Sequence, residues 1–383
     1  MFGWAHLSDA RRRHYDRSVR TVLVLGAGAS LAQAISYRPV QLKDHPPLDS
    51  TFFQTALALS AESRRIRLRV RALYNALPNA PQLSDPFARP VAPLEQFFAD
   101  VYYEVASRRR PEAYNVFVHL VRLYSSVIAH TTNWMAIRTD GGVLDRFLQT
   151  EIEAAGSDTP TVITFNHDLV IENCIYRLTR RSPDWCLTAL YADANFSQLR
   201  TAVGNPAFNH HNVECAHEPP VLVLKLHGSL NWSLKASRPA PPISETFPNT
   251  TSLRVYLQQR QEAGAGIWLH SPANRNKRRR YLWPLIVPPI YDKQRIVGMD
   301  LLQMMWDRAG DAVASAERIV LIGYSMPESD ILARQLMRRS YAANPARPPI
   351  DVVNPDGRVA TKIQNLLDCR VVRSYRDLPS FVQ

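Results

Sequence analysis

The stretch Leu23-Val24-Leu25-Gly26-Ala27-Gly28-Ala29-Ser30 decides the fold that this chain is expected to adopt. Its apolar residues predict a buried strand, and the small residues after them predict a turn into a helix, which directs backbone N–H groups toward an anion. Gly26 and Gly28 permit close approach that a Cβ would block, and Ser30 can cap the helix or bind a phosphate oxygen. Alone, the loop is equally well explained as a plain strand-to-helix turn. It has no third glycine, and no acidic residue is placed to bind a ribose hydroxyl.

A second apolar strand ends in polar side chains within Val162–Leu169, which reads Val-Ile-Thr-Phe-Asn-His-Asp-Leu. Polar groups at the carboxyl end of a strand lie where open α/β sheets bind ligands. Asp168 has a second explanation as a helix N-cap, since a carboxylate there accepts from backbone N–H groups and suits the helix dipole. That explanation gives Asn166 no role, so Asn166 is a candidate site residue.

Later strands end in the same way. An apolar run at 221–226 precedes His227-Gly228, one at 319–322 precedes Gly323-Tyr324-Ser325, and one at 350–353 precedes Asn354. A single histidine at a strand end is more often structural than catalytic. His227 therefore becomes a candidate through its place in the ordered set of motifs.

These motifs, in this order, resemble those of the SIR2-like (sirtuin-fold) family over most of the chain. In that family a Gly-Ala-Gly-x-Ser loop holds the phosphates of NAD, and residues 26–30 have this form. The resemblance implies that Asn166 and His227 are catalytic. The residues for which it implies contacts with NAD are Gly26, Ala27, Gly28, Ala29, Ser30, Thr164, Asp168, Gly323, Tyr324, Ser325 and Asn354.

Several features differ from the sirtuins that deacylate proteins. Those enzymes carry a structural zinc module of two Cys-x-x-Cys pairs, which no cysteine spacing here reproduces, so we expect no metal. Phe165 also stands where sirtuins carry Gln, and the segment between Ser30 and Asn166 is far longer than a compact sirtuin needs. In these respects the chain resembles the bacterial SIR2-like proteins of anti-phage defence, which lack zinc, carry a helical insertion and hydrolyse NAD. The cysteines are Cys174, Cys186, Cys215 and Cys369.

Strands alternating with helical segments predict an α/β fold with a Rossmann-like parallel sheet. The resemblance implies that this is a single SIR2-like NAD-binding domain over residues 1–383, with a large helical insertion at 49–155 and a second irregular, basic insertion at 235–280. Strands are predicted near 21–25, 161–165, 221–226, 318–323, 349–353 and 369–373. Apolar residues at helical spacing predict helices at 49–60, 94–107, 112–128 and 143–154.

Composition indicates a cytoplasmic protein. A chain of 383 residues that is 46% hydrophobic can bury a sizeable core. Residues 1–20 contain basic residues and no apolar segment typical of a secretory signal, and no apolar run approaches the ~18 residues of a membrane span. The scattered cysteines suit a reducing compartment. We therefore expect neither secretion nor membrane insertion.

The net charge of +12 raises the question of nucleic-acid binding, because Lys and Arg bind phosphate backbones. The basic clusters are spread along the chain, at 11–13, 64–69, 108–110 and 277–280. This spread leads us to expect no direct nucleic-acid binding. An acidic protein partner, or self-assembly, would use the same charge.

The activity implied by the resemblance is that of an NAD+ glycohydrolase, which cleaves the nicotinamide–ribose bond to give nicotinamide and ADP-ribose. Such an enzyme would be an NAD-depleting effector of anti-phage defence by abortive infection. Asn166 would guide water to the ribose, and His227 would be the general base. His167 is an alternative base because it adjoins Asn166.

Two other functions stay open: an NAD- or ADP-ribose-binding sensor or scaffold without turnover, and an NAD-dependent protein deacylase. The missing zinc module disfavours the deacylase. A defence NADase must be silent before infection, so the resemblance also implies control by homo-oligomerisation or by a separate activating protein, such as a HerA-like ATPase or an Argonaute-like protein. The two predicted insertions are the surfaces where we expect such control.

Overall fold

The computed structural model describes residues 20–38, 44–88, 93–106, 108, 110–156, 158–179, 190–191, 197–198, 219–236, 255–257, 281–287, 300–370 and 372–382. A six-stranded parallel sheet forms its centre, in the order β10-β9-β8-β1-β2-β4. This confirms the predicted α/β fold with a Rossmann-like parallel sheet. The strands are β1 Thr21–Leu25, β2 Thr161–Thr164, β4 Leu222–Lys225, β8 Arg318–Ile322, β9 Ile350–Val353 and β10 Val372–Tyr375.

The strand predictions agree with the structure to within one residue at each end, except for the last. β1 and β9 are buried along their whole length, as expected for parallel strands that are covered on both faces. The last strand was predicted at 369–373, but it begins at Val372. The reason is Asp368, which adopts a left-handed conformation (φ 50°) at the end of the preceding helix, so the apolar residue after it still belongs to the turn.

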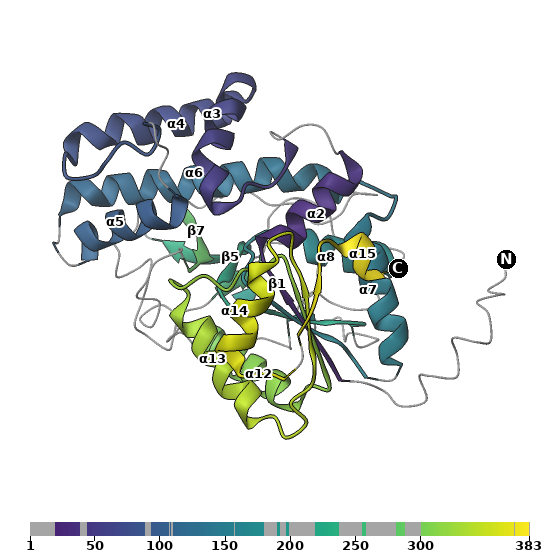
Figure 1. Ribbon diagram of the computed structural model, residues 1–383. Helices are drawn as coiled ribbons and strands as arrows, with labels where there is room; N and C mark the ends of the chain where they lie inside the picture. The colour runs from purple at the N-terminus through teal and green to yellow at the C-terminus, as the bar shows by residue number, and fades with distance from the viewer. Residues whose placement is uncertain are drawn as a thin grey trace.

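Helices cover the two faces of this sheet (Figure 1). On one face α2 and α8 pack against α7, which also contacts the C-terminal α15, and on the other α12, α13 and α14 pack side by side. Their bounds are α2 Ala27–Tyr37, α7 Val143–Ala155, α8 Val170–Leu178, α12 Asp300–Ser315, α13 Ile331–Ala343, α14 Arg358–Leu367 and α15 Leu378–Val382.

A second group of helices forms a lobe at the upper left of Figure 1, beside the sheet. Aromatic rings fill its interior, with Phe53 in edge contact with both Phe87 and Phe97. The predicted helices at 49–60, 94–107 and 112–128 are confirmed here, and that at 143–154 is α7. The lobe comprises α3 Phe52–Glu62, α4 Arg64–Ala76, α5 Leu94–Ala106 and α6 Pro111–Ala136.

Helix α4 was not predicted as a helix, because its arginines read as a basic cluster. It is amphipathic: Ile66 and Leu73 are buried on one side, and arginines occupy much of the rest. The Ser63 side chain caps its start by accepting from the N–H of Ile66. None of the described helices has the length and apolar character required to cross a membrane.

The structure also contains a smaller four-stranded sheet, in the order β3-β6-β5-β7. Its β5 starts immediately after His227 and pairs with β7 in the antiparallel sense. Of the predicted basic insertion at 235–280, only 235–236 and 255–257 lie among the described residues, and the predicted basic clusters at 11–13 and 277–280 lie outside them. The bounds are β3 Ser197–Gln198, β5 Gly228–Ala236, β6 Val255–Leu257 and β7 Tyr281–Ile286.

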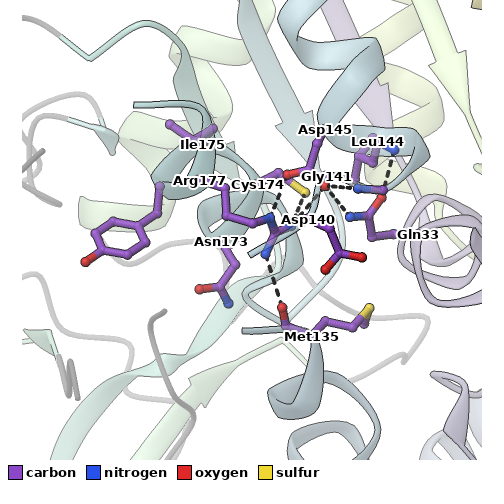
Figure 2. Close-up of polar contacts among 12 residues, drawn as sticks. Gln33, Met135, Asp140, Gly141, Leu144, Asp145, Asn173, Cys174, Ile175 and Arg177 are labelled. Carbon is purple, nitrogen blue, oxygen red and sulfur yellow. Dashed lines mark hydrogen bonds and ion pairs between the residues drawn. The ribbon is translucent and has the colours of Figure 1, made fainter. Parts of the chain in front are cut away.

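A buried polar cluster joins α2, α7 and α8, and Figure 2 shows Asp145 between Gln33 and Arg177. Asp145 accepts bonds from Nε (2.8 Å) and Nη2 (3.1 Å) of Arg177, from Gln33 Nε2 and from the N–H of Gly142. Arg177 also donates to the carbonyl of Met135 at the end of α6. The cluster therefore fixes α2 and α8, the two helices that follow β1 and β2.

Candidate functional site

The order in which the chain adds strands to the parallel sheet reverses between β1 and β8. The chain passes from β1 to β2 and β4 on one side, and then returns to β8, β9 and β10 on the other. Ligands of open α/β sheets bind at such a switch point, beyond the carboxyl ends of the strands. The turns at this place are residues 26–28 after β1 and residues 323–325 after β8, both of which were predicted to contact NAD.

The two turns are packed directly against each other. The N–H of Gly26 donates to the carbonyl of Ile322, and that of Gly28 to the carbonyl of Gly323, both at 3.0 Å. A Cβ on Gly28 would lie 2.7 Å from the Cα of Gly323. One on Gly323, whose φ is +58°, would lie 2.4 Å from the N of Ala29. Glycine is thus required for this approach, and the N–H of Gly28 is engaged by protein.

Asn166, Ser30 and Asp168 form one hydrogen-bond network. Asn166 Nδ2 donates to the Gly26 carbonyl at 2.9 Å and to Ser30 Oγ at 3.1 Å, and the Ser30 hydroxyl donates to Asp168 Oδ2 at 2.8 Å. Since both acceptors of the amide are oxygens, the NH₂ group faces the glycine turn and the amide oxygen faces away from it. Ser30 is part of this network and does not cap α2.

Asp168 is buried and held from several sides. Its Oδ1 accepts from the N–H of Val170 at 2.9 Å, the bond of an N-terminal helix turn. Burial raises the pKa of its carboxyl above the ordinary value of 3.8, and the opposing effect of the Lys225 charge is smaller. Asp168 therefore lies one residue before Leu169, the N-cap of α8, and its carboxylate orders the turn into that helix. Its predicted contact with NAD stays a prediction.

A buried ion pair that the sequence did not reveal lies beneath this loop. Lys225, at the end of β4, has a fully buried side chain whose Nζ donates to Glu172 Oε1 at 2.8 Å and to the backbone carbonyl of Asp168. The Tyr191 hydroxyl donates to the same Glu172 oxygen at 2.7 Å. A lysine in the otherwise apolar run 221–226 was the available signal, since a buried lysine requires a partner.

His227 lies among aromatic rings and one carboxylate. Its ring meets that of Phe165 at 5.0 Å between centroids, and its Nε2 lies 3.6 Å from Asp330 Oδ1. Phe165 also stacks on Tyr324 at 4.4 Å with an angle of 15° between the planes. Trp306 supports the strand end by donating from Nε1 to the carbonyl of Leu226. Phe165, adjacent to Asn166 in sequence, thus connects the asparagine network to His227.

His167, the alternative base, points toward the helical lobe. Its Nδ1 is 2.7 Å from the hydroxyl of Tyr124 on α6, and its ring lies 6.2 Å from that of His227. Burial raises the pKa of Tyr124, which keeps the phenol protonated. Tyr124 is partly buried against the core, and it connects the lobe to the loop after β2.

The other predicted residues occupy more peripheral places. The hydroxyl of Thr164 donates to the carbonyl of Leu25 and accepts from the N–H of Asn166, so it shapes the loop from within. Ala29 is buried, whereas Ala27 and Ser325 are exposed at the edge of the sheet. Asn354 lies beyond β9, where its side chain accepts from the N–H of Asp356 at 3.0 Å.

A metal site is not found in the part of the chain that the structure describes, where no three His, Cys, Asp or Glu side chains are grouped to hold an ion. Cys174 and Cys369 are buried there as free thiols. Cys186 and Cys215 lie outside the described residues.

Comparisons with known proteins gave matches among solved structures. No protein-family model and no curated protein sequence matches the chain. A Sir2 homolog–NAD complex has a TM-score of 0.41 at 13% identity, covering 99% of this chain and 92% of that chain. A Sir2–p53 peptide–NAD+ complex has a TM-score of 0.37 at 13% identity, with coverage of 94% and 90%. A structure described as the basis for the mechanism and regulation of Sir2 enzymes has a TM-score of 0.35 at 11% identity, covering 94% of this chain and 88% of that chain. The similarity concerns the fold alone.

Proposed function

We propose that this protein is an NAD+ glycohydrolase that releases nicotinamide and ADP-ribose. The observation that supports this most is the placement of the Asn166 amide. It is held between the Gly26 carbonyl and Ser30 at the switch point of the sheet, and the neighbouring Phe165 ring contacts His227. The order of the motifs along the chain supports the same assignment.

The nicotinamide–ribose bond breaks through an oxocarbenium-like transition state, so an enzyme must position NAD and guide water to the anomeric carbon. Because the Asn166 NH₂ is bound to protein, its amide oxygen accepts a hydrogen bond from that water. The water oxygen bonds to the anomeric carbon while the C–N bond breaks. The electron pair of that bond returns to the pyridinium ring, and nicotinamide leaves as a neutral molecule.

His227 accepts the proton that the water loses. An imidazole titrates near neutral pH, and general-base assistance contributes on the order of 10²–10⁴ in rate. Burial and the ring contact with Phe165 hold His227 in a fixed position. His167 is turned toward Tyr124, which favours His227 as the base.

The NAD pyrophosphate is proposed to lie across the paired glycine turns. The N-terminus of α2 favours negative charge, and the close packing of the two glycine turns holds that N-terminus in place. Ala27 and Ser325 are exposed at these turns, and half-buried Asn354 is proposed to contact the adenosine ribose. We extend the proposal to the biological output: NAD depletion as a defence response, controlled by homo-oligomerisation or by a separate activating protein.

Chromatography of NAD incubated with the purified protein tests this function. We expect nicotinamide and ADP-ribose in equal amounts from NAD alone, and no product with Asn166→Ala. A parallel sample with an acetylated lysine peptide distinguishes the deacylase, which releases nicotinamide only when the peptide is present. NAD that binds and stays intact in every sample would instead support the sensor.

A further inference from the structure

Asp330 occupies the N-cap position of α13 without capping the helix. An aspartate there normally accepts from a backbone N–H of the first turn, which stabilises the helix. In the described part of the chain its side chain makes no such bond. Instead Oδ1 lies 3.6 Å from His227 Nε2, and Oδ2 accepts from the Tyr324 hydroxyl at 2.8 Å. The carboxylate is therefore directed to the switch point and away from its own helix.

We infer that Asp330 is a positioning residue for His227, which it orients and whose protonated form it stabilises. This rests on the proposed NAD hydrolysis. A carboxylate beside Nε2 favours the ring proton on that nitrogen and leaves the lone pair on Nδ1. When Nδ1 takes the proton of the attacking water, the positive charge that forms is paired with Asp330. The side chains of His227 and Asp330 are only 8% and 3% exposed, so water screens this attraction weakly.

Tyr324 and Phe165 keep this arrangement in place. Burial, followed by the nearby Asp330 charge, raises the pKa of Tyr324 well above its ordinary value, so its hydroxyl stays protonated and donates to Asp330. The Phe165 ring stacks on Tyr324 and meets His227 edge-on, which fixes both rings. Phe165, which stands where the resembling sirtuins carry Gln, thus supports the carboxylate–imidazole pair.

The titration of His227 tests the inference without NAD. Among the described residues, the Asp330 carboxylate lies beside His227, the ring of His167 is 6.2 Å away, and Tyr324 donates to Asp330. Protein labelled with ¹³C at the histidine Cε1 atoms reports the protonation of each ring by NMR, and His227→Gln identifies the signal. An opposite charge at this distance raises the pKa of an imidazole by about one to three units.

We therefore expect Asp330→Asn to lower the pKa of His227 by at least about one unit, a tenfold loss in proton affinity. Asp330→Glu, which keeps the carboxylate, should restore part of that loss. Asp311→Asn is the matched control, since it removes an exposed carboxylate from α12, and should leave the titration unchanged. An unchanged His227 pKa in folded Asp330→Asn would overturn the inference. If Asp330→Asn does not fold, Tyr324→Phe takes its place, and we expect it to shift the His227 titration. An unchanged titration in Tyr324→Phe would then overturn the inference.

The activity measurement separates this inference from the proposed function. In an active enzyme Asp330→Asn should lower kcat with little change in KM, and should move the acidic limb of the kcat/KM profile to lower pH by the same amount as the NMR titration. A shifted titration without any NAD cleavage would contradict the hydrolase and keep the positioning role. NAD cleavage with an unshifted titration would support the hydrolase and contradict the positioning role of Asp330.

Discussion

The Nδ2 group of Asn166 donates to the carbonyl oxygen of Gly26 over 2.9 Å, and so joins the loop after β2 to the turn after β1. The same nitrogen reaches Ser30 Oγ, whose own proton goes to Asp168. Each group in this chain of bonds has its donor or acceptor role fixed by its neighbour. The amide oxygen of Asn166 is consequently directed outward, where a substrate or water would meet it.

Asn166→Asp tests the orientation of this amide with almost no change in volume. The substitution places an oxygen against the Gly26 carbonyl, where a donor is needed, so the bond is replaced by repulsion. We expect the free energy of unfolding to fall by about 1–3 kcal/mol and NAD turnover to fall by about 10²-fold or more. Urea denaturation and nicotinamide release measure the two effects. Asn75→Asp on the exposed face of α4 is the control. An equal loss of stability and turnover in Asn75→Asp would contradict the role of the Asn166 hydrogen-bond network.

The contact between the glycine turns predicts a large cost for Gly323→Ala. The new Cβ would lie 2.4 Å from the backbone N of Ala29, and the residue would keep a φ of +58°. We expect a loss of at least about 2 kcal/mol in unfolding free energy, together with weaker NAD binding measured by calorimetry. Gly357→Ala, where no atom lies within 4 Å, should be nearly neutral. Equal stability of the two variants would show that the turns separate easily.

The buried cluster of Figure 2 predicts that Asp145→Ala is strongly destabilising. The substitution leaves the Arg177 guanidinium buried without its carboxylate, and we expect a loss of about 3–5 kcal/mol. Asp140→Ala removes an exposed partner of Arg138 and should cost less than about 1 kcal/mol. Thermal and urea unfolding of both variants measure the difference. Similar values for the two would mean that the cluster does not fix α2 and α8.

The pKa of Asp168 predicts how stability changes with pH. Because burial raises this pKa in the folded protein, the folded state binds more protons than the unfolded state once the pH exceeds 3.8. Stability contributed by this group must then fall as the pH rises from 3.8 through the raised folded-state pKa. We expect the unfolding free energy of the wild type, minus that of Asp168→Asn, to decrease over this window. A difference that stays constant or increases would contradict the raised pKa.

Much of the fold could be predicted from local sequence because each strand of the parallel sheet is a short apolar run. The position of the site could also be predicted from local sequence, because parallel strands bring their carboxyl ends to one edge of the sheet. Ser30, Asn166 and Asp168 meet at that edge. The structure places these residues together, while their roles toward NAD remain proposals.

The residues that the sequence did not reveal act across long separations. Asp330 reads as an ordinary helix cap, and only the folded chain shows its carboxylate facing His227. Lys225 and Glu172 pair from β4 and α8, and Tyr124 reaches His167 from the helical lobe. Such contacts depend on how elements pack, which the period of apolar residues does not specify.

Nicotinamide release by the wild type and by Asn166→Ala, with NAD binding measured on the same samples, tests the central proposal most directly. We expect release of nicotinamide by the wild type, loss of release in Asn166→Ala, and binding that survives in both, with Gly357→Ala behaving as the wild type. Equal release by the wild type and Asn166→Ala would contradict the assignment of this site, and binding without any release would contradict the hydrolase.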